Sequence, residues 1–168
     1  LAITRSRGLA QALEAHLSAL PLAQDPGAKA IGVKISGCPN SCGQHHIADI
    51  GFYGSSRKVG EREVPHYVLL LGGRTREGEA RFGQVVGRIP ARRVPEAVER
   101  ILKRYLEERQ NGESFQAYLD RVGAASFKPL LQDLQEVPPY EEAPEFYQDL
   151  GAEGEAFSVQ LGRGECAV

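Results

Sequence analysis

The sequence has no methionine, no tryptophan and only three cysteines among its 168 residues. A small, odd number of cysteines is unlike the disulfide frameworks of secreted proteins, so we expect a reducing compartment, the cytoplasm. Without methionine the chain has no initiator residue, and we interpret it as a piece of a longer polypeptide. There is no apolar run of membrane-spanning length and no signal-peptide pattern at the start, so we expect no membrane association.

The chain also lacks an excess of either charge. Twenty lysines and arginines stand against 22 aspartates and glutamates, which gives a net charge of -2. This balance provides no general attraction to nucleic acid, and we expect none as a partner. A hydrophobic fraction of 42% and a charged fraction of 25% are typical of a folded domain with its own core.

Periodicity near the start predicts a helix. Apolar residues recur at helical spacing from Arg7 to Leu20, with Ser6 as the expected N-cap and Pro21 just beyond the end. Residues 23–29 contain Asp-Pro-Gly and predict a turn.

The next part of the chain favours strands. Short β-branched or apolar runs predict strands at 30–35, 48–54 and 66–73, and a weaker one at 81–90. The charged segment 55–65 between the second and third of these is expected to form a hairpin-like connection.

From Val94 the apolar period changes to that of a helix. One stripe predicts an amphipathic helix, followed by a second short helix near 115–122 and a third at 127–134. The basic residues of the first helix alternate with glutamates, which is typical of a solvated face with i,i+4 ion pairs. Strands followed by helices indicate an α+β fold. After Val137 the sequence is acidic and rich in proline and glycine, which predicts an extended arm.

The stretch SGCPNSCGQHH, residues 36–46, places Cys38 and Cys42 three residues apart with two histidines directly after them. One interpretation is an interaction domain whose unmodified cysteines lie in a tight turn. A second is a small non-enzymatic zinc module using Cys38, Cys42 and either His45 or His46, although zinc ligands usually come from two separated loops. A third is an iron–sulfur cluster.

The residues around the cysteines meet the demands of an iron–sulfur cluster. Such a cluster needs soft thiolates on a loop whose backbone N–H groups face the sulfides. Gly37 and Gly43 allow close backbone approach, and Pro39 sets a bend. A cubane cluster normally takes four thiolates. Cys166 lies in the last three residues and is expected to be an exposed thiol, so at least two ligands must come from elsewhere.

The run GCPNSCGQHHIADIGFYG resembles the second cysteine pair of the sirohaem-dependent nitrite and sulfite reductases, in which G-C-P-N-x-C follows a C-x5-C pair. The resemblance continues through VLLLGGR, GRIP, AVERILKRYLEER and GESFQAYLDRVG and covers roughly residues 31–123. It implies a mixed sheet with helices packed on it. It further implies a cluster and sirohaem domain at 1–123, truncated on its N-terminal side, and a short helix plus an extended acidic arm at 124–168.

The resemblance implies a role for individual residues. Cys38 and Cys42 would be two of the four ligands of a 4Fe–4S cluster, and Cys42 would also bridge the cluster to the sirohaem iron. Asn40, Gly73 and Arg88 would lie against sirohaem, through a polar contact, a close backbone approach and a carboxylate contact respectively. From the residues alone, a turn asparagine, a strand-ending glycine and an exposed arginine are equally open. His45 and His46 are expected to support the loop rather than to bind metal.

By the same resemblance the chain would be a fragment of a six-electron oxidoreductase that reduces nitrite to ammonia or sulfite to sulfide. Its partners would be the upstream half of the same polypeptide and a ferredoxin or flavoprotein electron donor. The 4Fe–4S cluster and sirohaem are expected in the parent protein. The fragment alone, with two ligands missing, is expected to lack both cofactors and to be inactive.

Overall fold

The computed structural model describes residues 2–76 and 78–159. Its main element is a four-stranded sheet in the order β1-β2-β3-β6. The sheet is mixed, because β1 runs parallel to β2 whereas the other neighbouring strands are antiparallel. The strands are β1 (Val33–Ser36), β2 (Ile50–Val59), β3 (Arg62–Leu71) and β6 (Gln84–Pro90). The α+β fold with a mixed sheet is therefore confirmed.

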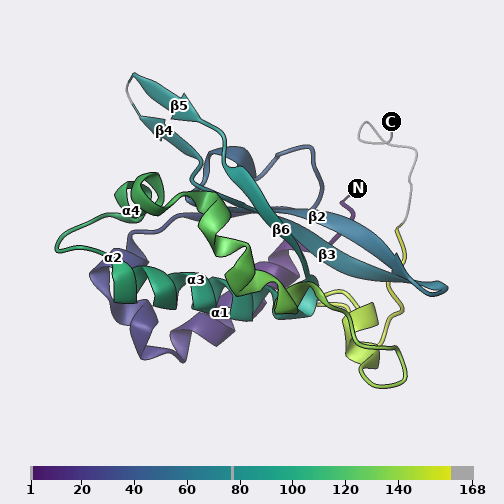
Figure 1. Cartoon of the computed structure of the whole chain (residues 1–168). Coiled ribbons are helices and arrows are strands. Elements are labelled where there is room, and N and C mark those ends of the chain that lie inside the picture. The colour runs from purple at the N-terminus through teal and green to yellow at the C-terminus, as the bar shows by residue number, and fades with distance from the viewer. Residues whose placement is uncertain (1, 77, 160–168) are drawn as a thin grey trace.

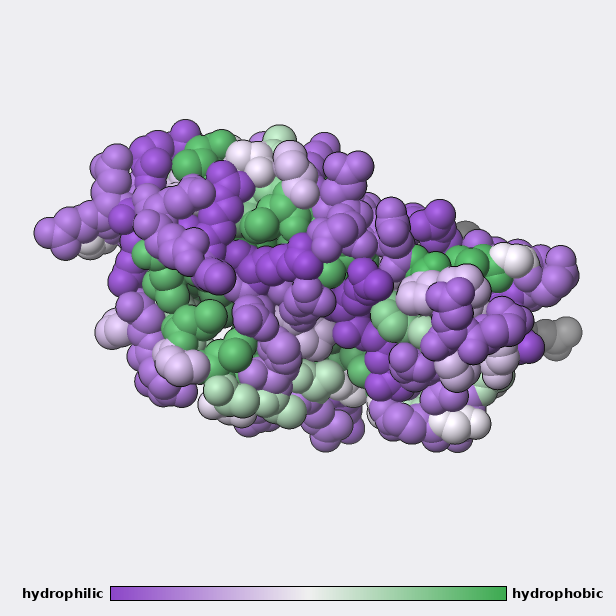
Figure 2. Space-filling model, turned by 60° about the horizontal axis from the view of Figure 1, so that its bottom comes forward, coloured by the Kyte–Doolittle hydropathy of each residue, from purple (hydrophilic) through white to green (hydrophobic). Residues whose placement is uncertain are grey.

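Four α-helices accompany the sheet: α1 (Ser6–Ser18), α2 (Pro26–Lys29), α3 (Val94–Glu108) and α4 (Phe115–Val122). Figure 1 shows α1, α2 and α3 together on one side of the sheet. Side chains alternate between the two faces of a strand, so every second residue of β2 and β3 faces these helices, including Phe52, Tyr67 and Leu69, which are fully buried. Seen from the helix side, the surface is mainly hydrophilic, with hydrophobic residues in small groups (Figure 2).

The apolar stripe of α3 forms the centre of the core, as its spacing predicts. The stripe is buried along its whole length. Pro95 lies in the first turn, where a missing N–H costs no hydrogen bond. Along the outer face, Arg100 pairs with Glu96 and Arg104 with Glu108, each at i,i+4. The predicted solvated, ion-paired face is therefore confirmed.

The charged segment 55–65 forms the end of a hairpin, as predicted, but its residues are paired in strands almost to the turn rather than forming a loop. β2 and β3 pair without interruption from Ile50 opposite Leu71 to Val59 opposite Arg62, with a turn at Gly60 and Glu61. The outer half of this hairpin extends beyond the helices in Figure 1, and much of it contacts water. This exposure explains why charged residues are tolerated there. A second small hairpin, β4 (Arg74–Arg76) with β5 (Glu79–Arg81), was not predicted.

Several predicted boundaries need correction. Ser6 is the first residue of α1 rather than its cap, and α1 ends at Ser18 rather than Leu20. The predicted turn at 23–29 contains the single-turn α2, capped by the Asp25 carboxylate. β1 begins at Val33 rather than 30, and β6 begins at Gln84 rather than 81.

The helix predicted at 127–134 is also wrong. The chain forms three separate 3-10 turns there, Ala124–Phe127, Pro129–Leu131 and Asp133–Gln135. These turns bury Phe127, Leu131 and Leu134. The apolar spacing that suggested a helix therefore reflects burial of these side chains. Pro129 has no N–H to donate to the Ala125 carbonyl, so the turns do not join into one helix from Ala124.

The residues after Val137 are irregular, as predicted, but they do not extend away from the domain. We call residues 138–159 the C-terminal arm. It contains one 3-10 turn, Pro144–Tyr147, and it buries Tyr147, Asp149 and Leu150. Among the residues that the structure describes, no helix has both the length and the apolar character needed to cross a membrane.

Candidate functional site: the cysteine loop

Residues 37–44, here called the cysteine loop, connect the end of β1 to a 3-10 turn, His45–Ile47. In Figure 1 the loop lies on the side of the sheet away from α1 and α3. Cys38 is half-buried, Cys42 and Asn40 are exposed, and both cysteines are free thiols. The loop therefore presents its polar and sulfur-containing groups on the face that the helices leave open.

Ser36, the last residue of β1, holds the far end of the loop. Its hydroxyl oxygen accepts a hydrogen bond from the Gly43 N–H at 3.0 Å and lies 2.8 Å from Nδ1 of His45. His45 is fully buried, and burial, with a smaller effect of neighbouring His46, lowers its pKa to about 4. The ring is therefore neutral near pH 7, and we assign Nδ1 as the acceptor of the Ser36 hydroxyl proton. Nε2 then has no hydrogen-bond partner among the described residues.

A second serine–histidine pair supports the middle of the loop. The Ser41 hydroxyl lies 2.7 Å from Nδ1 of His46, and the Ser41 carbonyl accepts from the Gln44 N–H at 2.7 Å. Ser41 and Gln44 have φ values of 58° and 56°, a left-handed conformation that is uncommon for residues other than glycine. Such strain persists only where surrounding contacts hold it. The two pairs thus agree with the expected supporting role of both histidines.

The beginning of the loop is held from the N-terminal segment. The Gly37 carbonyl accepts from the backbone N–H of Thr4 at 3.0 Å and from its hydroxyl at 3.3 Å. Gly54 lies behind the same carbonyl, and a Cβ at this position would lie only 2.2 Å from the Gly37 oxygen. Cys38, the next residue, therefore begins from a fixed backbone position.

The open face of the sheet continues from the loop toward β6. Tyr53, Val68 and Arg88 are neighbours across three strands and point to this face. With Val85, they line a hollow whose rim includes Lys128 from the chain after α4. Arg88 is exposed and, within the described residues, has no carboxylate partner. The hollow thus combines apolar walls with two basic side chains.

Large apolar side chains are also exposed on the connection into β6 and on that strand. Phe82 is 71% exposed and Val85 53% exposed. The Phe82 ring lies 5.3 Å, centroid to centroid, from the ring of His46, which contacts Ser41 of the cysteine loop. An apolar surface therefore extends from the cysteine loop to β6.

The residues predicted from the sequence do not all lie at one point. Cys38, Asn40 and Cys42 share the loop, whereas Arg88 lies on β6. Gly73 packs behind the loop, and a Cβ there would lie 2.3 Å from the His46 carbonyl oxygen, so the protein backbone itself requires glycine. Cys166 lies outside the residues that the structure describes.

Sequence reasoning missed Ser36 and Thr4. Ser36 is an ordinary serine at the end of a strand. The carbonyl to which Thr4 donates, that of Gly37, lies 33 residues away in the sequence. No local pattern marks either residue.

The side chains of the cysteine loop supply only part of a metal or cluster site. Among the described residues, no three histidine, cysteine, aspartate or glutamate side chains come together as a metal site would require. The loop offers two soft thiols, which suits iron–sulfur chemistry, but a cubane normally takes four. The residues therefore fit half of a cluster site, and the zinc alternative receives no support.

Comparison with known proteins finds sulfite reductases among the relatives of this chain. Residues 3–137 match the family model described as the nitrite and sulphite reductase 4Fe-4S domain. The chain is 33% identical over 95 residues to sulfite reductase (ferredoxin) 1 of Mycolicibacterium paratuberculosis, covering 55% of this chain and 17% of that protein. It is 31% identical over 101 residues to the sulfite reductase (NADPH) hemoprotein beta-component of Dickeya chrysanthemi, covering 60% and 16%.

A solved structure agrees with these sequence relatives. The Mycobacterium tuberculosis NirA protein aligns with a TM-score of 0.57 and 29% identity, over 69% of this chain and 21% of that chain. The present chain thus spans about a sixth to a fifth of the length of these relatives. Because the family model covers most of the sequence, the chain belongs to the nitrite and sulphite reductase 4Fe-4S domain family.

Proposed function

We propose that this chain contributes half of the cluster site of a sirohaem- and 4Fe–4S-dependent reductase, with Cys38 and Cys42 as two of the four cluster ligands. The observation that carries this proposal is the position of both thiols on one braced loop, on the open face of a domain of this family. The chain has only one further cysteine, Cys166, so at least one thiolate comes from another part of the parent protein. The proposal takes both remaining thiolates from there.

Within this proposal Cys42 would hold sirohaem as well as the cluster. Cys42 is the more exposed of the two thiols, so a second group can reach it. When bound, the coupled cofactors supply single electrons for the six-electron reduction of nitrite to ammonia or of sulfite to sulfide. The loop residues act by holding the two thiols in place through the Ser36–His45 and Ser41–His46 contacts.

Sirohaem is a large ring that carries several carboxylates, and the open face provides groups for both features. Tyr53, Val68 and Val85 offer apolar contact, and Arg88 and Lys128 offer positive charge at the rim of the same hollow. Arg88 can donate two parallel hydrogen bonds to a carboxylate. Asn40, exposed on the loop, offers a further polar contact to the cofactor, whereas Gly73 is buried against the His46 carbonyl and keeps a packing role.

We further propose that the chain alone is inactive and loses any cluster that forms on it. Two thiolates leave two iron corners of a cubane without protein ligands, and tight metal binding requires the full set at fixed geometry. In this proposal the electron donor is a ferredoxin, which the name of one relative mentions, or a flavoprotein.

The test uses the full-length parent protein, produced with a supply of sirohaem and purified without oxygen. Iron, acid-labile sulfide, sirohaem and visible absorption are measured for the parent and for its Cys38→Ser, Cys42→Ser and Cys166→Ser variants. We expect loss of the cluster in the first two variants and retention in the third. A folded parent that is colourless and free of iron would refute the proposal. One zinc per chain in the 168-residue piece would support the zinc module instead.

A further inference from the structure

The C-terminal arm, residues 138–159, lies beyond the region that matches the family, which ends at residue 137. The arm is nevertheless integrated into the domain. Tyr147 and Leu150 are buried, and the Val159 N–H donates to the Glu63 carboxylate on β3 at 2.7 Å. Figure 1 shows the arm, in yellow, beside the end of the sheet near the N-terminus. An acidic segment that only solubilised a chain end would not need such contacts.

Asp149 makes the central contact between the arm and the start of α1. Its side chain is only 5% exposed, and it accepts hydrogen bonds from the backbone N–H of Arg5 at 2.6 Å and of Leu150 at 2.9 Å. Arg5 is the residue just before α1, and its side chain caps no backbone N–H of the helix. Asp149, 144 residues away, accepts the backbone N–H of Arg5 itself, one of the N–H groups at the helix start that lack a partner within the helix. A carboxylate at this end of the helix also faces the positive end of the helix dipole.

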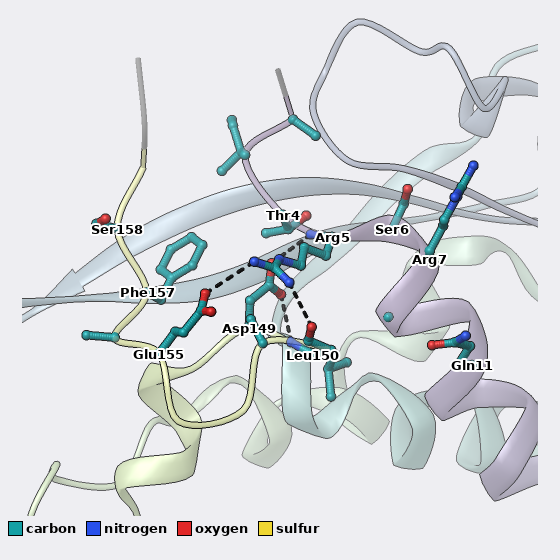
Figure 3. A pocket seen from close by; sticks show the side chains of 16 residues that line it. Thr4, Arg5, Ser6, Arg7, Gln11, Asp149, Leu150, Glu155, Phe157 and Ser158 are labelled. Carbon is teal, nitrogen blue, oxygen red and sulfur yellow. Dashed lines mark hydrogen bonds and ion pairs between the residues drawn. The ribbon is translucent and has the colours of Figure 1, made fainter. Parts of the chain in front are cut away.

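Further contacts fix Arg5 to the arm. Figure 3 looks into a pocket between α1 and the arm, where Asp149 and Glu155 point toward Arg5. The Arg5 guanidinium donates to the Gly151 carbonyl at 2.8 Å and to the Glu155 carboxylate at 3.3 Å. The backbone and the side chain of Arg5 are thus both bound to the arm.

Gly8 shows that α1 and the arm are fitted to each other. A Cβ at this position would lie 1.9 Å from the carbonyl oxygen of Leu150. Glycine inside a helix is less favourable than alanine. At this position glycine permits direct backbone contact between α1 and the arm, and an alanine side chain would push the Leu150 carbonyl away.

The arm is connected to the cysteine loop through two consecutive residues. Arg5 is held by Asp149, and Thr4, which is 2% exposed, donates twice to the carbonyl of Gly37. Gly37 is bonded to Cys38. Displacement of the arm would therefore release the backbone that holds the first cysteine.

We propose that the C-terminal arm is a clasp that holds the segment before α1 against the cysteine loop, with Asp149 as the positioning residue. The clasp keeps Cys38 at a fixed backbone position, whereas Cys42, held through Ser41 and Gly43, does not depend on it. The importance of the clasp for cluster binding rests on the proposed function. The coupling between the arm and the cysteine loop is independent of that function.

The test measures thiol accessibility in the 168-residue chain carrying Cys166→Ser, so that only Cys38 and Cys42 react. Iodoacetamide labelling is followed by mass spectrometry, which separates the two sites. In Asp149→Ala the hydrogen bond from the Arg5 N–H to Asp149 is lost, and with it the restraint on Thr4, which holds the Gly37 carbonyl. We therefore expect Cys38 to react about tenfold faster. Cys42 should change little, and amide exchange at Thr4 and Arg5 should accelerate. Gly8→Ala should have the same effects, since it displaces Leu150.

Asp133→Ala provides the matched control, because Asp133 pairs with Arg100 and has no connection to the loop. It should leave the Cys38 rate unchanged. A folded Asp149→Ala variant with the wild-type Cys38 rate would overturn the clasp, and so would equal acceleration of both cysteines and of α3 amides. If Asp149→Ala does not fold, Gly8→Ala decides by the same readouts. None of these readouts requires a cluster, so failure here is distinct from failure of the proposed function.

Discussion

The Ser36 hydroxyl oxygen lies 2.8 Å from Nδ1 of His45 and 3.0 Å from the backbone nitrogen of Gly43, so one side chain joins both sides of the cysteine loop. Ser36 is 3% exposed, and His45 is fully buried. The loop that carries Cys38 and Cys42 therefore has an internal polar support that water cannot easily replace.

Replacing Ser36 by alanine should destabilise the chain by about 1 to 3 kcal/mol, because the Gly43 N–H and His45 Nδ1 would both lose a buried partner. Urea unfolding monitored by circular dichroism measures this change. Ser18→Ala is the control, since the exposed Ser18 hydroxyl bonds only to the nearby Ala15 carbonyl, and it should stay close to wild type. Equal stability of Ser36→Ala and wild type would contradict the role of this hydroxyl.

The chain should lose stability in mild acid because of His45. Its pKa in the folded chain is about 4, lowered by burial and by His46 from the ordinary value of 6.5. The unfolded chain therefore binds the proton more tightly. The contribution of the neutral ring is fully present above pH 6.5 and is lost as the pH falls from 6.5 toward 4.

Comparison with His45→Gln isolates this effect from the titration of carboxylates. Urea unfolding at about pH 7 and about pH 5 should show a larger loss of stability for wild type than for His45→Gln. Parallel losses in the two proteins would mean that His45 does not titrate in this manner.

Gly73→Ala should disturb the packing behind the cysteine loop. The added Cβ would meet the His46 carbonyl oxygen at 2.3 Å, and a backbone atom can move only with its turn, so we expect a cost of about 1 to 3 kcal/mol. Gly87→Ala on β6 is the control, because its nearest contacts, at 3.5 Å, are ordinary. Thermal unfolding of both variants should show a clear decrease only for Gly73→Ala, and a similar decrease in both would argue against this steric explanation.

Asp120 on α4 anchors the small β4–β5 hairpin. It accepts from Arg74 at 2.7 Å and from Arg81 at 2.9 Å, and the Arg74 contact is the main reason that the pKa of Asp120 lies below its usual value. These groups are partly exposed, so Asp120→Ala should cost less than about 1 kcal/mol of global stability. Amide exchange within residues 74–81 should nevertheless accelerate. Unchanged exchange there would show that other contacts hold the hairpin.

Local patterns were sufficient for the elements whose apolar residues repeat regularly. The stripe of α3 and the apolar centres of β2 and β3 follow from periodicity, because neighbouring residues of one element share a buried face. They were not sufficient to show that the two strands of the hairpin continue through most of 55–65, or that 127–134 forms separate turns packed against β6 instead of a helix. Backbone pairing and distant packing leave no short-range signal.

The run around Cys38 and Cys42, together with the similar stretches that follow it, was enough to indicate the family, because consecutive residues encode both. The assignment of the two cysteines as cluster ligands stays a prediction. Only the tertiary structure decided what supports that site. Ser36 reaches His45 across the loop, and Asp149 reaches Arg5 from a segment that looked merely acidic and extended. The reason is physical: a buried carboxylate is tolerated only where donors meet it, and the Arg5 donor lies 144 residues away in the sequence.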